Sequence, residues 1–345
     1  MLPVYQAQRP WLREGRPPRV LLIPGDGIGP EVTGAARLVL SKTIRLCGVR
    51  LELREAEAGD RAQERYGDPL PEETRRLASG WADAVLKGPV GETAGSVVVP
   101  LRRMLGVYAN IRPARSLPGA PSLGEVDLVI VRENLEDVYA GVEWSVPGAA
   151  FAVKIVTEAE SRRVARVAAW YASKRRRRVT IVHKANVLRL ADGLFRDAAR
   201  AELQGSGLEV DEMYVDAAAM EMVRNPSKFD VVLTMNQYGD ILSDLAAQVA
   251  GGIGLAPSAN VGDAKALFEP VHGAAWDIAG RGVANPTAMI LTVSLMLDWL
   301  GYEKASAAVA RAVEETLARG ERTPDLGGSL GTMEYAERVA ARIAC

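Results

Sequence analysis

The segment Val20-Leu-Leu-Ile-Pro-Gly25-Asp-Gly-Ile-Gly29-Pro30-Glu31 decides the fold, because an apolar strand-like run leads through a glycine turn into a helical pattern. A glycine-rich turn at this place suggests the dinucleotide-binding fingerprint of a Rossmann fold. That fingerprint requires a third glycine three residues after the second, and Pro30 occupies the position. The sequence therefore predicts a strand, a tight glycine turn and a helix, but no Rossmann fold. The turn either lines a cleft or simply joins the strand to the helix.

Apolar runs rich in β-branched residues alternate with helical patterns along the rest of the chain. The further strand-like runs are residues 84–87, 128–131, 179–182 and 231–234. This alternation is typical of an α/β protein with a central sheet.

Two stretches mark crossings between domains. Residues 113–124 are rich in Pro, Gly and Ser, and three glycines occur within residues 251–254. We therefore expect a discontinuous domain (residues 20–108 plus 252–345) and an internal domain (residues 109–251). Four prolines and no periodicity predict a loose arm at residues 1–19.

Composition places the chain among ordinary globular proteins. It has 345 residues, 48% hydrophobic and 25% charged, with a formal net charge of -1, which favours neither nucleic acid nor membrane as a partner. The basic run at residues 174–178 follows a helical pattern, so we interpret it as a solvated helix end. Cys47 and Cys345 are too few for a disulfide framework and lack metal-binding spacing, which predicts a cytoplasmic protein. We expect no targeting or membrane-spanning segment.

Asp240 and Asp244 stand four residues apart behind Gly239, at the start of an apolar, alanine-rich run that indicates a helix. Carboxylates one turn apart share a helix face. No lysine or arginine lies between them in the sequence to neutralise them, so a divalent cation is a natural occupant. The alternative is that both carboxylates only complement the helix dipole.

Several other side chains suit the chemistry of an acidic substrate. Arg102, Arg112 and Arg132 occur in three different segments, and converging guanidinium groups would bind a dicarboxylate or tricarboxylate, although each alone is an ordinary surface residue. Lys184 follows a strand-like run, where its pKa can be lowered for proton transfer, and Tyr139 follows Arg132 by seven residues.

These features belong to a set of nine segments in a fixed order. The segments are Gly25–Glu31, Leu86–Gly91, Tyr108–Pro113, Val131–Asn134, His183–Asn186, Gly239–Asp244, Ala256–Asp263, Phe268–Gly273 and Thr323–Gly328. From Val20 to the C-terminus the chain resembles the metal-dependent β-decarboxylating dehydrogenases of isocitrate, isopropylmalate and homoisocitrate. Residues 85–113 and 213–219 are most similar to the archaeal isopropylmalate-oxidising members.

The resemblance implies two α/β domains around a long central sheet and a homodimer with shared active sites. It implies Mg²⁺ or Mn²⁺ at Asp240 and Asp244, with Asp216 reaching across from the other subunit. Lys184, also from the partner, would accept the hydroxyl proton. Tyr139 would protonate the enolate after CO₂ leaves, and Arg102, Arg112 and Arg132 would hold the substrate carboxylates.

The resemblance also implies NAD⁺ as the cofactor, bound in loops of the first domain. Asp277 matches the position where an acidic residue accepts hydrogen bonds from the adenosine ribose and repels a 2′-phosphate. His272 and Gly273 belong to the same loop, and Asn285 would lie near the adenine.

The last expectation concerns the substrate. Pro100 suits a first helical turn, so we expect Val98 and Val99 at the start of a helix, about one turn before Arg102, where their methyl groups would meet an isopropyl branch. The alternatives are that both valines pack in the core, or that the substrate is isocitrate or homoisocitrate. A further alternative is a non-catalytic regulatory subunit, which would be expected to lack an acid, base or metal residue, whereas all of them are present. Leu135 replaces the Thr or Ser of many relatives, and we interpret this change as tuning of the pocket wall that affects the fine geometry of substrate binding.

Overall fold

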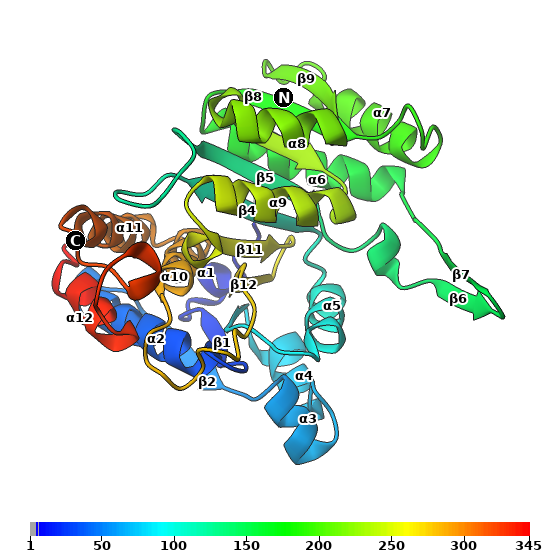
Figure 1. Cartoon of the computed structure of the whole chain (residues 1–345). Helices are drawn as coiled ribbons and strands as arrows, with labels where there is room; N and C mark the ends of the chain where they lie inside the picture. Colours follow the sequence, from blue (N-terminus) through cyan, green and yellow to red (C-terminus); the bar gives the residue numbers. More distant parts are fainter. Residues whose placement is uncertain (1–4, 6) are drawn as a thin grey trace. The chain divides into compact units, whose positions relative to one another are not determined.

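The computed structural model describes Tyr5 and residues 7–345, and it divides into two compact units (Figure 1). The inserted unit comprises Val107–Ser116 and Ser122–Ala250 with Tyr5, and the terminal unit comprises Ala7–Gly106, Leu117–Pro121 and Gly251–Cys345. The expected internal domain, residues 109–251, differs from the inserted unit at its ends and at Leu117–Pro121, which belong to the terminal unit.

Each unit supplies five strands to the sheet. The terminal unit has the order β2 (Glu52–Glu55), β1 (Arg19–Ile23), β3 (Ala84–Lys87), β12 (Ala266–Pro270) and β11 (Pro257–Val261). The inserted unit has the order β4 (Ala109–Arg115), β5 (Asp127–Glu133), β10 (Val231–Thr234), β8 (Arg178–His183) and β9 (Glu209–Tyr214). Pairing is parallel except between β11 and β12 and between β4 and β5. This arrangement confirms an α/β fold with a long central sheet that is not a Rossmann fold.

Helices connect and cover these strands. In the terminal unit they are α1 (Pro10–Glu14), α2 (Gly29–Cys47), α3 (Asp60–Tyr66), α4 (Glu72–Arg76), α5 (Ala94–Leu105), α10 (Thr287–Leu300), α11 (Glu303–Ala318) and α12 (Thr332–Ala341). In the inserted unit they are α6 (Glu158–Ser173), α7 (Ala191–Leu203), α8 (Val215–Arg224) and α9 (Asn236–Val249). None of the helices in the described residues is long and apolar enough to cross a membrane.

The glycine turn after β1 has the predicted form. Gly25 and Gly27 have φ angles of 80° and 55°, a region that favours glycine. A Cβ on Gly25 would lie 2.0 Å from the carbonyl oxygen of Pro89, and one on Gly27 would lie 2.0 Å from that of Ala274. The turn therefore touches two neighbouring loops so closely that no side chain fits, which is more than a plain strand-to-helix connection requires.

The expectation of a loose arm is wrong for the part of it that the structure describes from Ala7 onward. Helix α1 buries Trp11, whose ring packs 5.5 Å from that of Trp299. Arg16 forms a two-pronged ion pair with the buried Asp83. The prolines prevent a periodic pattern in this segment, but the segment still packs against the terminal unit because the aromatic side chain of Trp11 is buried. The expectation for residues 1–4 and 6 lies outside the described residues.

The two cysteines, which the sequence did not suggest to be partners, form a disulfide. Cys47 ends α2 and Cys345 ends the chain, with Cα atoms 5.3 Å apart across a separation of 298 residues. Helices α2 and α12 pack against each other and bring the two residues together. The disulfide thus closes nearly the whole chain into a loop.

One face of the inserted unit's sheet packs against α8 and α9. Leu128 and Ile130 of β5 join Leu242 and Ala246 of α9 in a buried apolar cluster. The basic run at residues 174–178 joins α6 to β8, and its Arg175 pairs with Asp127 and Asp230 instead of extending freely into solvent.

A two-stranded hairpin, β6 (Glu143–Val146) and β7 (Ala149–Ala152), projects from the inserted unit (Figure 1). Every residue in both strands is exposed, including Trp144 and Phe151, whose rings stack 5.1 Å apart. An isolated hairpin is marginally stable in water. The two stacked rings leave apolar surface exposed on this hairpin.

Candidate active site

Antiparallel pairing of β4 with β5 places Arg112 and Arg132 on one face of the inserted unit's sheet. Asn110 lies opposite Arg132, and Arg112 follows Asn110 by two residues, so both arginine side chains leave the same face. That face of β5 also carries Leu128 and Ile130, which are buried under α9. The apolar row that packs against α9 therefore ends in an arginine.

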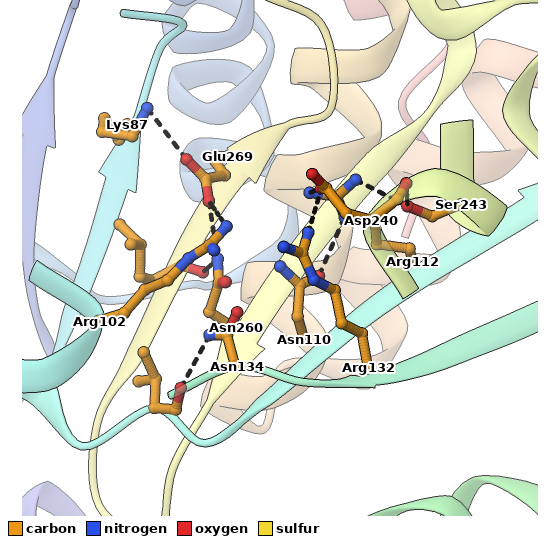
Figure 2. A network of polar contacts seen from close by, with 12 residues as sticks. Lys87, Arg102, Asn110, Arg112, Arg132, Asn134, Asp240, Ser243, Asn260 and Glu269 are labelled. Carbon is orange, nitrogen blue, oxygen red and sulfur yellow. Dashed lines mark hydrogen bonds and ion pairs between the residues drawn. The ribbon is translucent and has the colours of Figure 1, made fainter. Parts of the chain in front are cut away.

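Arg132 is a buried cation that lies against Asp240 (Figure 2). Its Nε and Nη2 donate to Oδ1 of Asn236 at 2.9 and 2.7 Å, and its Nη1 pairs with Asp240. Buried guanidinium groups require such partners, because an unpaired charge costs several kcal/mol. Asn236 was not singled out in the sequence, although it begins the helix that carries Asp240.

Arg112 lies beside both aspartates of α9. Its Nη1 is 3.2 Å from Oδ1 of Asp244 and donates to Oγ of Ser243 at 2.7 Å, while its Nη2 is 3.6 Å from Oδ1 of Asp240. No cation lies between the aspartates in the sequence, but Arg112 and Arg132 reach them in space from β4 and β5. Burial raises the pKa of Asp244, an effect that Arg112 opposes.

The two carboxylates lie beyond the first turn of α9, since the helix begins at Asn236. The alternative that both carboxylates only complement the helix dipole is therefore weakened, because the dipole acts mainly on charges in the first turn. Both side chains remain accessible, at 38% for Asp240 and 55% for Asp244. Among Tyr5 and residues 7–345, no three His, Cys, Asp or Glu side chains gather to hold a metal ion. Asp240 and Asp244 therefore supply two accessible carboxylates that lie one helical turn apart.

Tyr139 joins the same cluster. It lies in a short 3-10 turn (η2, Val138–Ala140), and its hydroxyl donates to Oδ2 of Asp240 at 2.5 Å. The guanidinium of Arg132 lies 5.1 Å from the centre of its ring. The structure therefore brings together Tyr139, Arg112, Arg132, Asp240 and Asp244, all within the inserted unit.

Lys184 and Asp216 form a second pair in the inserted unit. Parallel β8 and β9 end together, with His183 opposite Tyr214, so the residues that follow each strand emerge at one edge. Lys184 Nζ forms an ion pair with Asp216, and their hydrogen bond lowers the pKa of Asp216. Within one chain, Asp216 does not complete a trio with Asp240 and Asp244.

The peptide around Leu135 folds over a buried glutamate. The N–H groups of Leu135 and Glu136 donate to Oε1 of Glu133 at 2.6 and 3.0 Å. Burial raises the pKa of Glu133 to about 7, despite these two hydrogen bonds.

Arg102 lies in the terminal unit and is buried against Glu269 (Figure 2). Its Nη2 is 3.2 Å from Glu269 Oε1, Lys87 Nζ is 3.0 Å from Oε2, and Asn260 donates to Oε1 at 3.0 Å. Burial alone would raise the pKa of Glu269, but the two cations outweigh it and lower the pKa to about 2. Arg102 is therefore not an ordinary surface arginine, and the convergence of all three arginines stays a prediction.

Helix α5 begins earlier than predicted. It starts at Ala94, and Pro100 lies inside it, so Val98 and Val99 occupy the second turn instead of the first. The buried Val97 and Leu101 anchor the helix on both sides of the proline, and this burial offsets the loss of one backbone hydrogen bond. Val98 and Val99 are only partly buried and precede Arg102 by one turn, as predicted. The valine that packs in the core is Val97, and not Val98 or Val99.

The predicted cofactor residues surround one loop of the terminal unit. His272 Nδ1 donates to the carbonyl of Gly273 at 3.1 Å, and its buried Nε2 has no hydrogen-bond partner among the described residues. Burial lowers the pKa of His272, which favours the neutral ring. Asp277 is exposed on the loop, and Asn285 donates to Asp325 at 2.9 Å.

Two further residues hold this loop and were not predicted. Glu31 accepts the N–H groups of Gly280 and Gly282. Asp325 also accepts the hydroxyl of Thr323 at 2.5 Å. Glu31 and Asp325 both lie in motifs quoted from the sequence, and this membership is the signal by which they could have been found.

Comparison with known proteins gives one consistent result. A family profile described as isocitrate/isopropylmalate dehydrogenase matches residues 19–339. The chain is 51% identical to a 3-isopropylmalate dehydrogenase of Saccharolobus solfataricus over 331 residues, which cover 93% of this chain and 98% of that protein. It is 47% identical to an isocitrate/homoisocitrate dehydrogenase of Thermus thermophilus over 328 residues, covering 93% and 97%.

The fold is similar to a solved isocitrate dehydrogenase from Methylococcus capsulatus. The TM-score is 0.90 at 42% identity, and the match covers 95% of this chain and 100% of that chain. Overall identity therefore places the chain among these enzymes, but relatives with different substrates in their names are almost equally similar.

Proposed function

Because the chain belongs to the isocitrate/isopropylmalate dehydrogenase family and is a dehydrogenase, we propose that it oxidises and decarboxylates 3-isopropylmalate. The products are 4-methyl-2-oxopentanoate and CO₂, in a step of leucine biosynthesis. The observation that carries the substrate assignment is the apolar surface that Val98 and Val99 present one turn before Arg102.

The helical geometry of α5 supports this assignment. Successive residues turn by about 100°, so Val98 and Val99 lie roughly 40° and 60° from Arg102 around the helix, whereas Ser96 lies about 120° away. A substrate group near Arg102 would therefore meet methyl groups before it meets the hydroxyl. Burial of an isopropyl group gains about 2 kcal/mol, whereas an unpaired carboxylate against valines costs at least that much.

The specific rival is oxidation of isocitrate or homoisocitrate, which the Thermus thermophilus relative favours by its name. Rates of NAD⁺ reduction with the three substrates, measured side by side, separate the readings. We expect kcat/KM for 3-isopropylmalate to be at least about 30-fold higher, which corresponds to the 2 kcal/mol above. Equal or higher efficiency with isocitrate would reject the assignment.

Variants of α5 sharpen this test. Val98→Asn or Val99→Arg should move preference toward the more acidic substrates. Ser96→Arg is the matched control, since it adds the same charge to an exposed position on another side of the helix. A shift in Ser96→Arg as large as in Val99→Arg would show that general charge, and not the valine surface, sets preference.

Substrate carboxylates would bind Arg102, Arg112 and Arg132. Guanidinium forks hold carboxylates in two-pronged pairs, and all three are buried or mostly buried, where such pairs are strongest. Arg112 and Arg132 now bind Asp240, and we infer that substrate carboxylates replace the aspartate as their partner when a cation engages Asp240.

We assign Mg²⁺ or Mn²⁺ to Asp240 and Asp244, with Asp216 of a second subunit as a third donor. The fit rests on accessible carboxylate oxygens one helical turn apart, the donor type that these cations prefer. When bound, the cation would polarise the substrate hydroxyl and stabilise negative charge as CO₂ leaves.

The chain's own residues would move the protons. Lys184 would accept the hydroxyl proton as a neutral amine, and its contact with Asp216 orients the side chain. Tyr139 would return a proton to the enolate carbon, since its hydroxyl already points toward Asp240.

We also propose NAD⁺ over NADP⁺. The exposed Asp277 would accept the ribose hydroxyls and repel a 2′-phosphate, and the unpartnered Nε2 of His272 remains for a ligand's hydrogen bond. Asn285 would lie near the adenine and Gly273 would leave room for the cofactor. Equal kcat/KM with both cofactors would contradict the assignment of Asp277.

The active enzyme is proposed to be a homodimer with shared sites. The uncovered hairpin and exposed Met220 and Val223 on α8 supply apolar surface for a second copy. Subunits carrying Lys184→Ala and Asp240→Asn are each inactive, but their heterodimer has one site with both lesions and one with neither. About half of the wild-type activity should return. No recovery in verified heterodimers would reject shared sites.

A cytoplasmic location is part of the same proposal. The disulfide between Cys47 and Cys345 argues against it for most organisms, because cytosolic disulfides are common only in hyperthermophiles. Fractionation of the source cells tests the location.

A further inference from the structure

A buried cluster of charges lies apart from the residues assigned above. Lys154 follows β7, and its Nζ is 3.1 Å from Oδ1 of Asp192 and 3.6 Å from Oδ1 of Asp137. The same ammonium lies 4.3 Å from the centre of the Tyr238 ring. Both aspartates are fully buried, at 1% and 0% exposure. One cation therefore holds two buried anions together.

Asp137 organises the turn that carries Tyr139. Its Oδ1 accepts the N–H of Val138 at 2.8 Å, at the start of that turn. Its Oδ2 accepts the N–H of Gln237 at 3.0 Å, in the first turn of α9. Asp137 has a φ angle of 68°, which is unusual for a residue other than glycine, so surrounding contacts must hold it there. The position of Tyr139 relative to α9 thus depends on Asp137.

Asp192 organises the segment that carries Lys184. Its Oδ2 accepts the backbone N–H of Lys184 at 2.7 Å, while its Oδ1 faces Lys154. The ring of Tyr238, in the first turn of α9, lies against the same ammonium. Three segments that bear proposed catalytic or metal-binding residues therefore meet at Lys154.

We propose that Lys154 is a positioning residue that holds the Tyr139 turn and the Lys184 segment of one subunit in register. This inference rests on the proposed function and on its shared sites. Without the ammonium, Asp137 and Asp192 are two buried anions that no cation separates, and one of them must move toward water. Either movement displaces a catalytic side chain.

The sharing of sites gives Lys154 a distinctive consequence. Tyr139 serves the site of its own subunit, whereas Lys184 serves the site of its partner. Loss of Lys154 in one subunit therefore damages both sites of a dimer, although only one chain is altered. Tyr139→Phe or Lys184→Ala in one subunit damages one site only.

The test compares heterodimers of one wild-type and one variant subunit, purified with two different affinity tags. Heterodimers carrying Tyr139→Phe or Lys184→Ala should keep about half of the wild-type kcat, from their one intact site. The heterodimer with Lys154→Met should fall well below half, toward the Lys154→Met homodimer. A displacement of about 1 Å corresponds to a loss in kcat of roughly 100-fold.

Controls separate positioning from general damage. Lys174→Met is the matched control, because Lys174 also lies over an aromatic ring, that of Trp170, but is exposed. It should leave kcat unchanged. Lys154→Arg keeps the charge and should have most of the wild-type activity. In Lys154→Met, KM for the substrate should change little, because Arg112 and Arg132 are untouched. If Lys154→Met subunits fail to fold, Lys154→Gln takes their place.

Two results would overturn the inference in different ways. In the first, Lys184→Ala and Asp240→Asn subunits complement each other, but the Lys154→Met heterodimer keeps half of the wild-type kcat. This result would show that Lys154 serves one site only. Failure of that complementation would remove the shared sites, and the inference would fall together with this part of the proposed function.

Discussion

Gly239 is the residue of α9 on which the position of Arg132 depends most directly. A Cβ added to Gly239 would lie 2.5 Å from Cγ and 2.6 Å from Cβ of Arg132. These atoms belong to the base of the arginine side chain, so they cannot move away without a shift of β5 or α9. We therefore expect Gly239→Ala to displace the guanidinium from Asn236 and Asp240.

Two opposing effects set the size of the change. Alanine stabilises a helix interior by about 1 kcal/mol relative to glycine. Overpacking of this kind costs about 1–3 kcal/mol, so the net loss in the free energy of unfolding is up to about 2 kcal/mol. An unfolding entropy of about 2.1 cal/mol/K per residue makes this a fall in Tm of up to about 3 °C for this chain. Displacement of Arg132 should lower kcat/KM by about 100-fold.

Gly34→Ala is the matched control, since Gly34 lies inside α2 and an added Cβ would meet nothing within 4 Å. Its Tm should rise by about 1 °C and its activity should not change. Thermal unfolding and steady-state NAD⁺ reduction measure both quantities. If Gly239→Ala matched Gly34→Ala in Tm and kept the wild-type kcat/KM, close packing between Gly239 and Arg132 would not constrain the site.

Two further predictions concern stability. The pKa of Glu133 is raised to about 7 from 4.5, so the folded state keeps a proton that the unfolded state loses, and the free energy of unfolding should fall as pH rises between these values. The fall attributable to Glu133 is about 3 kcal/mol, and it should be missing when Glu133→Gln is unfolded with urea at the same pH values. If the free energy of unfolding changed with pH equally in the variant and the wild type, the assignment would be contradicted. Cys345→Ser removes the disulfide with Cys47 and should lower stability by about 2–4 kcal/mol without reductant. Dithiothreitol should bring the wild type to the same level and leave the variant unaffected, and a variant as stable as the oxidised wild type would exclude this role.

Local pattern was enough for much of the fold. The strands β3 and β10 have the predicted limits, because each of these short buried strands is apolar up to its last residue. The turn at Gly25 and Gly27 was also readable, since positive φ angles leave a glycine signature. The exposed β2 was not predicted, because a charged sequence with no buried side chain carries no strand pattern.

The site residues were found through motifs, but their interactions were decided by the tertiary structure. Arg132 and Asp240 are 108 residues apart, and the sequence around the aspartates gave no sign that strand arginines would neutralise them. The start of α5 was misjudged because the burial of Val97 and Leu101, which holds Pro100 inside the helix, depends on contacts that no local pattern contains.

Sequence by itself determined which residue types were available and in what order, since motifs and periodicity are written along the chain. Only the tertiary structure decided which charges share a buried space. Lys154 shows the difference, because nothing around it in the sequence marks it, yet it lies between Asp137 and Asp192. Burial makes the pairing of charges strong and obligatory, and burial is a property of the folded chain.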